Sequence, residues 1–350
     1  MSGLDRAAID GLDSGHMLTD ILALPEQLGD ALWRVESAAI EPIETPGGLI
    51  VAGMGGSAMG GALARAALGD QASRPILAAA GYGLPSWTTP DTTVLCASYS
   101  GNTEETLACF ESAGALGARR IVVTSGGILA GQARAESVPV IPIPAGFEPR
   151  AAIAYLLVSA LEVAALCGAG PRLAAELDVT ASHLEALVEQ WGPDAGEDAE
   201  PKVLAHQLHR SVPVIAGAGL TAQIAYRWKT QINENASMPA FAAELPELDH
   251  NEIAGWMGAG ALGPFSAVFL DDCDSHPRLR RRIELTERFV APHAHFTGVV
   301  ATRGESALER VCSLVLFGDL LSCYVAALNG VDPTAAPPLE ELKRQLALGE

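Results

Sequence analysis

Small hydroxyl residues gather in the stretch SYSGNTEETL, residues 98–107, directly after the apolar run TTVLCA at 92–97. The apolar run predicts a strand, and the acids and leucine that follow predict a helix. Ser98, Ser100 and Thr103 therefore stand where a strand ends and a helix begins. A helix N-terminus attracts anions through its unpaired N–H groups, the hydroxyls add donors, and Gly101 lets the backbone come close. A site of this kind without Lys or Arg suits a small phosphomonoester.

The same residues also have a structural interpretation that needs no ligand. Asn102 and Thr103 are suitable helix N-caps, with Glu105 or Thr106 behind them. The Gly-rich stretch GMGGSAMGG at 53–61 is a weaker signal, because a dinucleotide site needs an acid after the next strand and RPILAAAG has none. No GxxxxGK[ST] run occurs in the sequence, which excludes a P-loop.

The elements around these motifs predict an α/β fold. Short apolar runs (GLIVAGMGG, RPILAAAG, TTVLCASYSG, RRIVVTSGG, VPVIPIP) alternate with helical stretches, which is typical of a parallel sheet covered on both faces. The pattern restarts at VPVIAGAG, and the openings of the two halves resemble each other. We predict two tandem doubly wound domains, with these boundaries: an N-terminal helical segment at 1–40, a first domain at 41–191, a linker at 192–202, a second domain at 203–330 and a tail helix at 331–350.

Composition narrows the class of partner. The 350 residues include 22 Lys or Arg and 42 Asp or Glu, a net charge of −20, which disfavours nucleic acid and anionic membranes as partners. Six scattered cysteines form no CxxC pair, and the His pairs at 206/209 and 293/295 lack fitting partners, so no metal is expected. The N-terminus is polar and acidic, and Glu162 interrupts the most apolar run, at 151–170. These features predict a cytoplasmic protein with a core helix at 151–170.

Four motifs together resemble one family. VAGMGGSAMGG, SYSGNTEETL, KTQINENASMPAF and ELPELDHNEIAGW follow one another as in the bifunctional phosphoglucose/phosphomannose isomerases, which are built from two sugar-isomerase (SIS) domains. The resemblance extends over about residues 45 to 345. It implies an aldose–ketose isomerase that interconverts glucose 6-phosphate and mannose 6-phosphate with fructose 6-phosphate through an enediolate, without a metal or organic cofactor. It also implies a homodimer.

The resemblance carries residue roles with it. The residues that it implies for binding the substrate phosphate are Gly55, Gly56, Ser57, Ser98, Ser100 and Thr103. Glu234 in NENAS resembles the base that moves a proton between C1 and C2, and Arg150 resembles the positive charge that faces the enediolate. His250 in LDHNEIAGW resembles the ring-opening residue donated by the partner subunit, and Lys343 resembles a C-terminal lysine that assists ring opening. We expect a loop at PAFAAELPELD, residues 239–249, to present His250.

The sequence also departs from the family pattern. Asp249 stands where Asn is expected, Ser237 stands where a basic residue is usual, and the tail at 333–338 carries a Pro pair. These changes leave the choice between glucose and mannose open, together with a paralogue that acts on another sugar phosphate. A sugar-phosphate-binding regulator would need a DNA-binding helix, and the first 40 residues offer no basic recognition helix. An amidotransferase would need an N-terminal nucleophilic Cys, and residue 2 is Ser.

Overall fold

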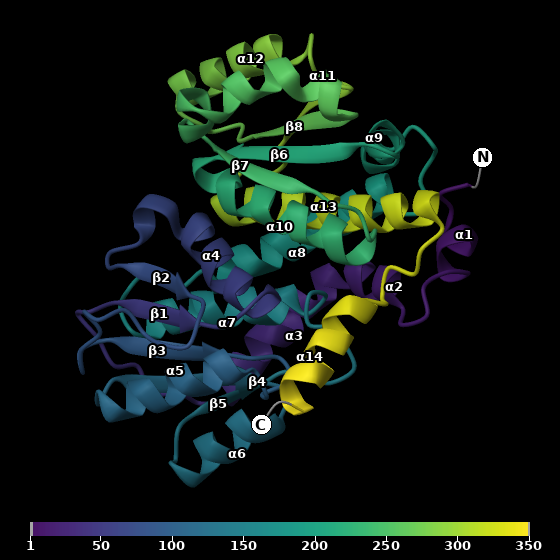
Figure 1. Ribbon diagram of the computed structural model, residues 1–350. Coiled ribbons are helices and arrows are strands. Elements are labelled where there is room, and N and C mark those ends of the chain that lie inside the picture. The colour runs from purple at the N-terminus through teal and green to yellow at the C-terminus, as the bar shows by residue number, and fades with distance from the viewer. Residues whose placement is uncertain (1–2, 349–350) are drawn as a thin grey trace. The chain divides into compact units, whose positions relative to one another are not determined.

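The computed structural model describes residues 3–348, which fall into two compact units. The first-sheet unit comprises residues 23–185 and 304–312, and the second-sheet unit comprises the described residues before 23, residues 186–303 and those from 313 onward. Each unit is built on one parallel sheet with helices on both faces (Figure 1). The prediction of two parallel sheets flanked by helices is thereby confirmed. The residue boundaries predicted for the domains stay a prediction.

The first sheet has the strand order β2-β1-β3-β4-β5, with every neighbouring pair parallel. Its strands are β1 (Leu49–Ala52), β2 (Ile76–Ala79), β3 (Thr93–Ala97), β4 (Arg119–Thr124) and β5 (Val140–Pro142). Every residue of β1 and β3 is buried, as expected of central strands covered on both sides. The helices of this unit are α3 (Leu24–Ser37), α4 (Gly56–Leu68), α5 (Glu104–Ala115), α6 (Gly127–Ala135) and α7 (Ile153–Leu166), and the 3₁₀ turn η1 is Gly69–Gln71.

Small residues let two of these helices pack closely. A Cβ at Gly60 of α4 would lie 2.6 Å from the backbone of Leu156 in α7, and one at Gly61 would lie 2.6 Å from Val51 in β1. Helix α4 therefore fits tightly between the sheet and α7. On the opposite face, Phe110 of α5 and Leu129 of α6 pack against the sheet in one apolar cluster. Helix α7 has 12 buried residues among its 14, which agrees with the core helix predicted at 151–170.

The second sheet has the order β7-β6-β8-β9 and is also entirely parallel. Its strands are β6 (Val212–Ala218), β7 (Phe241–Leu245), β8 (Phe265–Asp271) and β9 (Phe296–Ala301). The other elements assigned wholly to this unit are α1 (Arg6–Asp10), α2 (Met17–Leu22), α9 (Glu200–Leu208), η2 (Gly219–Thr221), α10 (Ala222–Asn235), η3 (Glu247–His250), η4 (Glu252–Gly258), α11 (Ala259–Leu262), α12 (Pro277–Val290) and α14 (Pro337–Leu348). Residues of α8 (Ala174–Trp191) and α13 (Ala307–Asn329) fall in both units.

Strand β7 corrects the loop expected at 239–249. Its residues pair in parallel with β6, from Val214 opposite Phe241 to Ala218 opposite Leu245. The segment is rich in Ala and bounded by Pro239 and Pro246, and this composition is more typical of a loop than of a strand. An edge position explains the strand, because β7 needs a hydrogen-bonded neighbour on one side only.

Helices α10 and α13 meet in a buried polar and aromatic contact. The Trp228 ring stacks on Phe317 at a centroid distance of 5.2 Å, and its Nε1–H donates to the Leu314 carbonyl at 2.7 Å. The Arg227 guanidinium binds Asp319 through Nε at 3.0 Å and Nη2 at 2.6 Å. Burial raises the pKa of Asp319, and the paired guanidinium opposes that rise. Because both charges are buried, removing either partner would leave the other uncompensated.

One helix among residues 3–348 is long and apolar enough to cross a membrane, namely α13. Its most apolar window is 94% buried inside the protein. This burial is typical of a core helix that packs on several sides. The burial of Trp228 against it, described above, accounts for part of that packing.

Candidate functional site

The strand order of the first sheet reverses between β1 and β3. The chain leaves β1 toward β2 on one side, and β3 lies on the other side of β1. Ligands of open parallel sheets bind in the crevice outside the carboxyl ends of the strands at such a reversal. Two loops leave this point, one from Gly53 to Gly56 and one from Ser98 to Thr103. All six residues predicted to bind phosphate lie on these loops or in the first turn of α4.

The loop after β3 is held in shape by its own hydroxyls. The hydroxyls of Ser98 and Thr103 share a hydrogen bond of 2.8 Å, and the Gly101 N–H donates to Ser98 Oγ at 3.1 Å. Ser100 is exposed, and its Oγ accepts from the Asn102 N–H at 3.3 Å. Gly101 has a φ of +69°, and a Cβ there would collide with the Gly126 carbonyl. The sharp turn therefore requires glycine.

The capping role expected of Asn102 and Thr103 turns out differently. Thr103 occupies the N-cap position of α5 but makes no side-chain cap bond, because its hydroxyl is engaged by Ser98. Asn102 instead accepts the Ile128 N–H through Oδ1 at 3.0 Å and so holds the start of α6. The first N–H groups of α5 therefore have no cap from Thr103, as a site for an anion requires.

Arg150 lies close to the loop after β1, at the carboxyl edge of the first sheet. Gly55 has a φ of +52°, and α4 begins at Gly56, with Ser57 6% exposed. A Cβ at Gly56 would lie 3.1 Å from the Pro149 carbonyl oxygen and 3.3 Å from the Cα of Arg150. Arg150 is buried, and its Nη1 lies 3.2 Å from a carboxylate oxygen of Glu148. The structure thus places Arg150 beside the start of α4 in the first-sheet unit.

Tyr99 connects the loop after β3 to the segment before Arg150, a role that the sequence did not predict. Its hydroxyl donates to the Pro144 carbonyl at 3.0 Å and accepts from the Phe147 N–H at 2.8 Å. Because Tyr99 stands between Ser98 and Ser100, it ties the loop after β3 to the segment that leads to Arg150. The only signal in the sequence was a tyrosine between two serines, and the partners of its hydroxyl lie more than forty residues away.

Glu234 lies in the last turn of α10, in the second-sheet unit, and is half-buried. Three asparagines fix the chain around it. Asn235 donates to Ser322 Oγ at 2.9 Å, Asn233 to the Met238 carbonyl at 2.9 Å, and Asn329 to the Ala236 carbonyl at 3.0 Å. The carboxylate therefore projects from a helix end that neighbouring elements hold in place.

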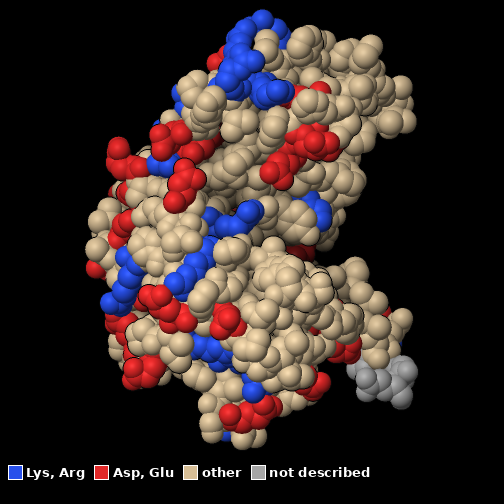
Figure 2. Space-filling model, turned by 90° about the vertical axis from the view of Figure 1, so that its left-hand side faces the viewer, with Lys and Arg blue, Asp and Glu red and all other residues tan. Residues whose placement is uncertain are grey.

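His250 is exposed at the end of η3, directly after the carboxyl end of β7. The residue before it is anchored to α12. Asp249 binds Arg282 Nη1 at 2.7 Å and Thr286 Oγ1 at 2.6 Å. Figure 2 shows basic side chains gathered at the top of the molecule, where this Arg-rich helix lies. Aspartate at 249 thus forms an ion pair with Arg282, where asparagine would offer only an uncharged hydrogen-bonding group.

Within one chain, Glu234 and His250 lie at opposite ends of the second sheet. Helix α10 runs back from the carboxyl end of β6 and ends before β7 begins, so Glu234 lies at the amino edge. His250 follows β7 and lies at the carboxyl edge. The five residues of β7 span about 16 Å at the usual rise per residue. Lys343 is exposed on α14, and no described contact brings it to either residue.

The potential metal ligands among the described residues do not cluster. Across residues 3–348, no three His, Cys, Asp or Glu side chains group in a way that could hold a metal ion. Five cysteines are buried and free, and Cys273 is exposed. Burial raises the pKa of Cys312 to about 12, so this thiol stays protonated near neutral pH.

Comparison with known proteins decides the family. Residues 197–346 match the model of the bacterial phospho-glucose isomerase C-terminal SIS domain. A bifunctional phosphoglucose/phosphomannose isomerase of Caldicellulosiruptor bescii is 35% identical over 95% of this chain and 99% of its own length. The chain belongs to the bifunctional phosphoglucose/phosphomannose isomerase family. The family member of Aquifex aeolicus is 33% identical over 85% of this chain and 90% of its own length.

A solved structure supports the fold. A hypothetical protein from Thermus thermophilus superposes with a TM-score of 0.73 and 18% identity, covering 99% of this chain and 94% of that one. At this identity the likeness shows the fold alone. The resemblance of the four motifs to the bifunctional phosphoglucose/phosphomannose isomerases is confirmed by the family relatives.

Proposed function

We propose that this chain interconverts glucose 6-phosphate and mannose 6-phosphate with fructose 6-phosphate. The observation that carries the proposal is the hydroxyl-rich loop at the reversal of the first sheet, together with Arg150 beside the start of α4 at the same reversal. In this proposal the substrate phosphate binds Ser57, Ser98, Ser100 and Thr103 and the N–H groups at Gly55 and Gly56. These neutral donors bind a dianion by hydrogen bonds and by the partial charge of two helix N-termini.

The proposed chemistry needs one base and one positive charge. Glu234 removes a proton from one of the two adjacent carbons and returns it to the other, which is general base and acid catalysis. Arg150 stabilises the negative charge that develops on the enediolate oxygen. Because a carboxylate and a guanidinium suffice for this proton transfer, the proposed reaction requires no metal or organic cofactor.

The protein is proposed to act as a cytoplasmic homodimer. His250 and Glu234 of one chain lie at opposite edges of the second sheet. A histidine that opens the sugar ring must reach the same substrate as the base. A second copy that supplies His250 meets this requirement, with Lys343 assisting ring opening. A histidine donated by the partner therefore explains why Glu234 and His250 of the same chain lie so far apart.

A coupled assay tests the proposed function directly. Purified protein is given fructose 6-phosphate, and glucose 6-phosphate and mannose 6-phosphate are scored separately with specific dehydrogenase couples. Formation of both products is expected, and their ratio reports the epimer preference. Formation of neither product, with tight binding of fructose 6-phosphate retained, would contradict catalysis and favour a binding protein.

The phosphate site predicts the effect of Ser100→Ala. A hydrogen bond to a charged group contributes about 1.5–3 kcal/mol. Loss of the Ser100 hydroxyl should therefore raise KM for fructose 6-phosphate by roughly ten- to a hundredfold, with a smaller effect on kcat. Ser112→Ala on α5 is the matched control and should leave KM unchanged. Equal KM values for the Ser100 and Ser112 variants would remove Ser100 from the site.

The anchor of His250 predicts the effect of Arg282→Gln. Without the guanidinium, Asp249 loses one of its two partners and η3 is held less firmly. We expect kcat with cyclic substrate to fall by up to about tenfold, equal to about 1.4 kcal/mol of barrier, while KM stays nearly constant. Arg281→Gln is the control, because Arg281 pairs with Glu284 on the exposed surface of the same helix. A kcat equal to that of the control would show that the anchor does not position His250.

A further inference from the structure

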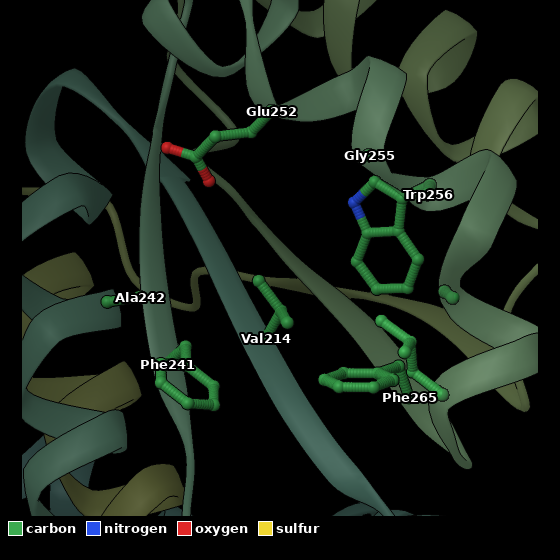
Figure 3. Close-up of a pocket in the computed structure, with 9 residues that line it drawn as sticks. Val214, Phe241, Ala242, Glu252, Gly255, Trp256 and Phe265 are labelled. Atoms are coloured by element: carbon green, nitrogen blue, oxygen red, sulfur yellow. The ribbon is translucent and has the colours of Figure 1, made fainter.

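A cavity of about 370 Å³ opens in the second-sheet unit, and none of the residues that line it has a role in the proposed function. Its sheet side is formed by Val214, Phe241 and Phe265, which lie at or near the starts of β6, β7 and β8. Its other side is formed by η4 and α11, through Trp256 and Leu262 among others (Figure 3). The cavity therefore lies at the amino edge of the sheet, whereas His250 follows its carboxyl edge.

The cavity also differs in face from the proposed base. Side chains of a strand alternate between the two faces. Val214 shares its face with Ala216 and Ala218, which pack in one apolar cluster with Trp256 and with Ile283 of α12. The cavity lies next to this apolar cluster, where the cluster is no longer covered. Helix α10, which carries Glu234, packs instead against α13 through the polar contact described above. Ligand binding in the cavity thus needs none of the proposed catalytic groups.

Two polar groups face the cavity. Trp256 is only 8% exposed, but its indole nitrogen is not among the buried polar atoms without a partner in residues 3–348, so this edge of the ring is open to the cavity. Figure 3 shows the indole nitrogen turned into the cavity and the Glu252 carboxylate at its rim. Water can accept from this N–H, and the cavity offers a ligand its aromatic rings and the Glu252 carboxylate. The carboxylate marks a place for a positive charge.

The lining defines the class of ligand. Three aromatic rings and one carboxylate face the cavity, and no Lys or Arg lines it. Aromatic faces attract cations, and aromatic cages with a carboxylate suit alkylammonium groups. The volume lies within the range of about 300–1,000 Å³ that is typical of small-molecule sites. We propose that this cavity binds a small organic ammonium ion with an apolar body, held by Glu252 and by the rings of Trp256, Phe241 and Phe265. This proposal does not rest on the proposed isomerase activity.

The test compares a cationic probe with its anionic analogue. 2-Phenylethylammonium and 3-phenylpropionate are titrated against the full chain by calorimetry and by the NMR resonance of the Trp256 indole N–H. That resonance is assigned with Trp256→Phe, whose melting temperature verifies the fold. Saturable binding of the ammonium probe with a shift of the Trp256 resonance is expected, and the anionic analogue should bind at least tenfold more weakly. Equal binding of the two probes would overturn the proposal.

The carboxylate has a matched control on the same unit. Glu252→Gln should weaken the ammonium probe by at least tenfold, whereas Glu244→Gln, an exposed position on β7, should leave its affinity unchanged. Because Glu252 is exposed, its replacement should not disturb folding. Wild-type affinity in Glu252→Gln would refute the site.

A second copy of the chain is the competing occupant. Met257 and Leu262 next to the cavity are 76% and 82% exposed, and exposed apolar side chains of this kind also mark protein contacts. Leu262→Asp would disrupt such a contact. If the probe bound only to this variant and the wild-type chain excluded it as a dimer, the cavity would be an interface and the proposal would be wrong. Equal probe affinity in wild type and variant is the expected result.

Discussion

Glu234→Gln is expected to lower kcat by about 10²-fold or more while KM changes little. Glutamine keeps the size and hydrogen-bonding capacity of glutamate but takes up no proton. The surroundings should tolerate the change, because the backbone at this helix end is held by Asn233, Asn235 and Asn329. The loss of turnover should therefore come without a loss of stability. Steady-state kinetics with fructose 6-phosphate and a thermal melt measure the two effects separately.

An exchange experiment identifies the base more directly. Proton abstraction from C2 of glucose 6-phosphate exchanges that hydrogen with solvent, and NMR in deuterated water follows the exchange. The exchange rate in Glu234→Gln should fall together with kcat. Glu244→Gln, which changes an exposed carboxylate on β7, is the matched control and should exchange at the wild-type rate. Wild-type exchange in Glu234→Gln would assign the proton transfer to another residue.

Local sequence patterns predicted most of the two sheets. Buried runs such as LIVA and TVLCA became central strands, because a strand covered on both faces must be apolar throughout. The hydroxyl-rich turn after β3 was predictable for a different reason, since the positive φ of Gly101 and the bond from its N–H to Ser98 are features of the local turn. The missed strand β7 is different. Its Ala-rich sequence forms a strand because it pairs with β6. The local residue pattern does not predict this pairing.

Side-chain partners that are distant in sequence were also beyond prediction. Tyr99 reaches Pro144 and Phe147, and Asp249 reaches Arg282. Neither pair follows from spacing, because each depends on the packing of elements that are far apart in the chain. The separation of Glu234 and His250 had the same origin. It follows from the direction of α10 and β7, which became visible only with the strand order of the second sheet.

His250→Ala is expected to reduce turnover of cyclic substrate by about 10²-fold or more, as loss of a general acid–base group does. Histidine suits ring opening because its ordinary pKa lets it donate and accept protons near neutral pH. Turnover of substrate supplied in an open-chain form should fall much less. His250 is exposed, so the variant should fold normally. An equal loss with both forms of substrate would contradict the ring-opening role.

Mixing two inactive variants tests whether the histidine comes from the partner. In a dimer of one Glu234→Gln chain and one His250→Ala chain, one site receives Glu234 from the second chain and His250 from the first. Random exchange makes about half of the dimers mixed, each with one intact site of two, so about a quarter of wild-type activity should return. Differently tagged chains, unfolded and refolded together, allow mixed dimers to be purified and assayed. Mixed dimers that form but remain inactive would show that His250 acts within its own subunit, and the opposite edges of the second sheet would then need another explanation.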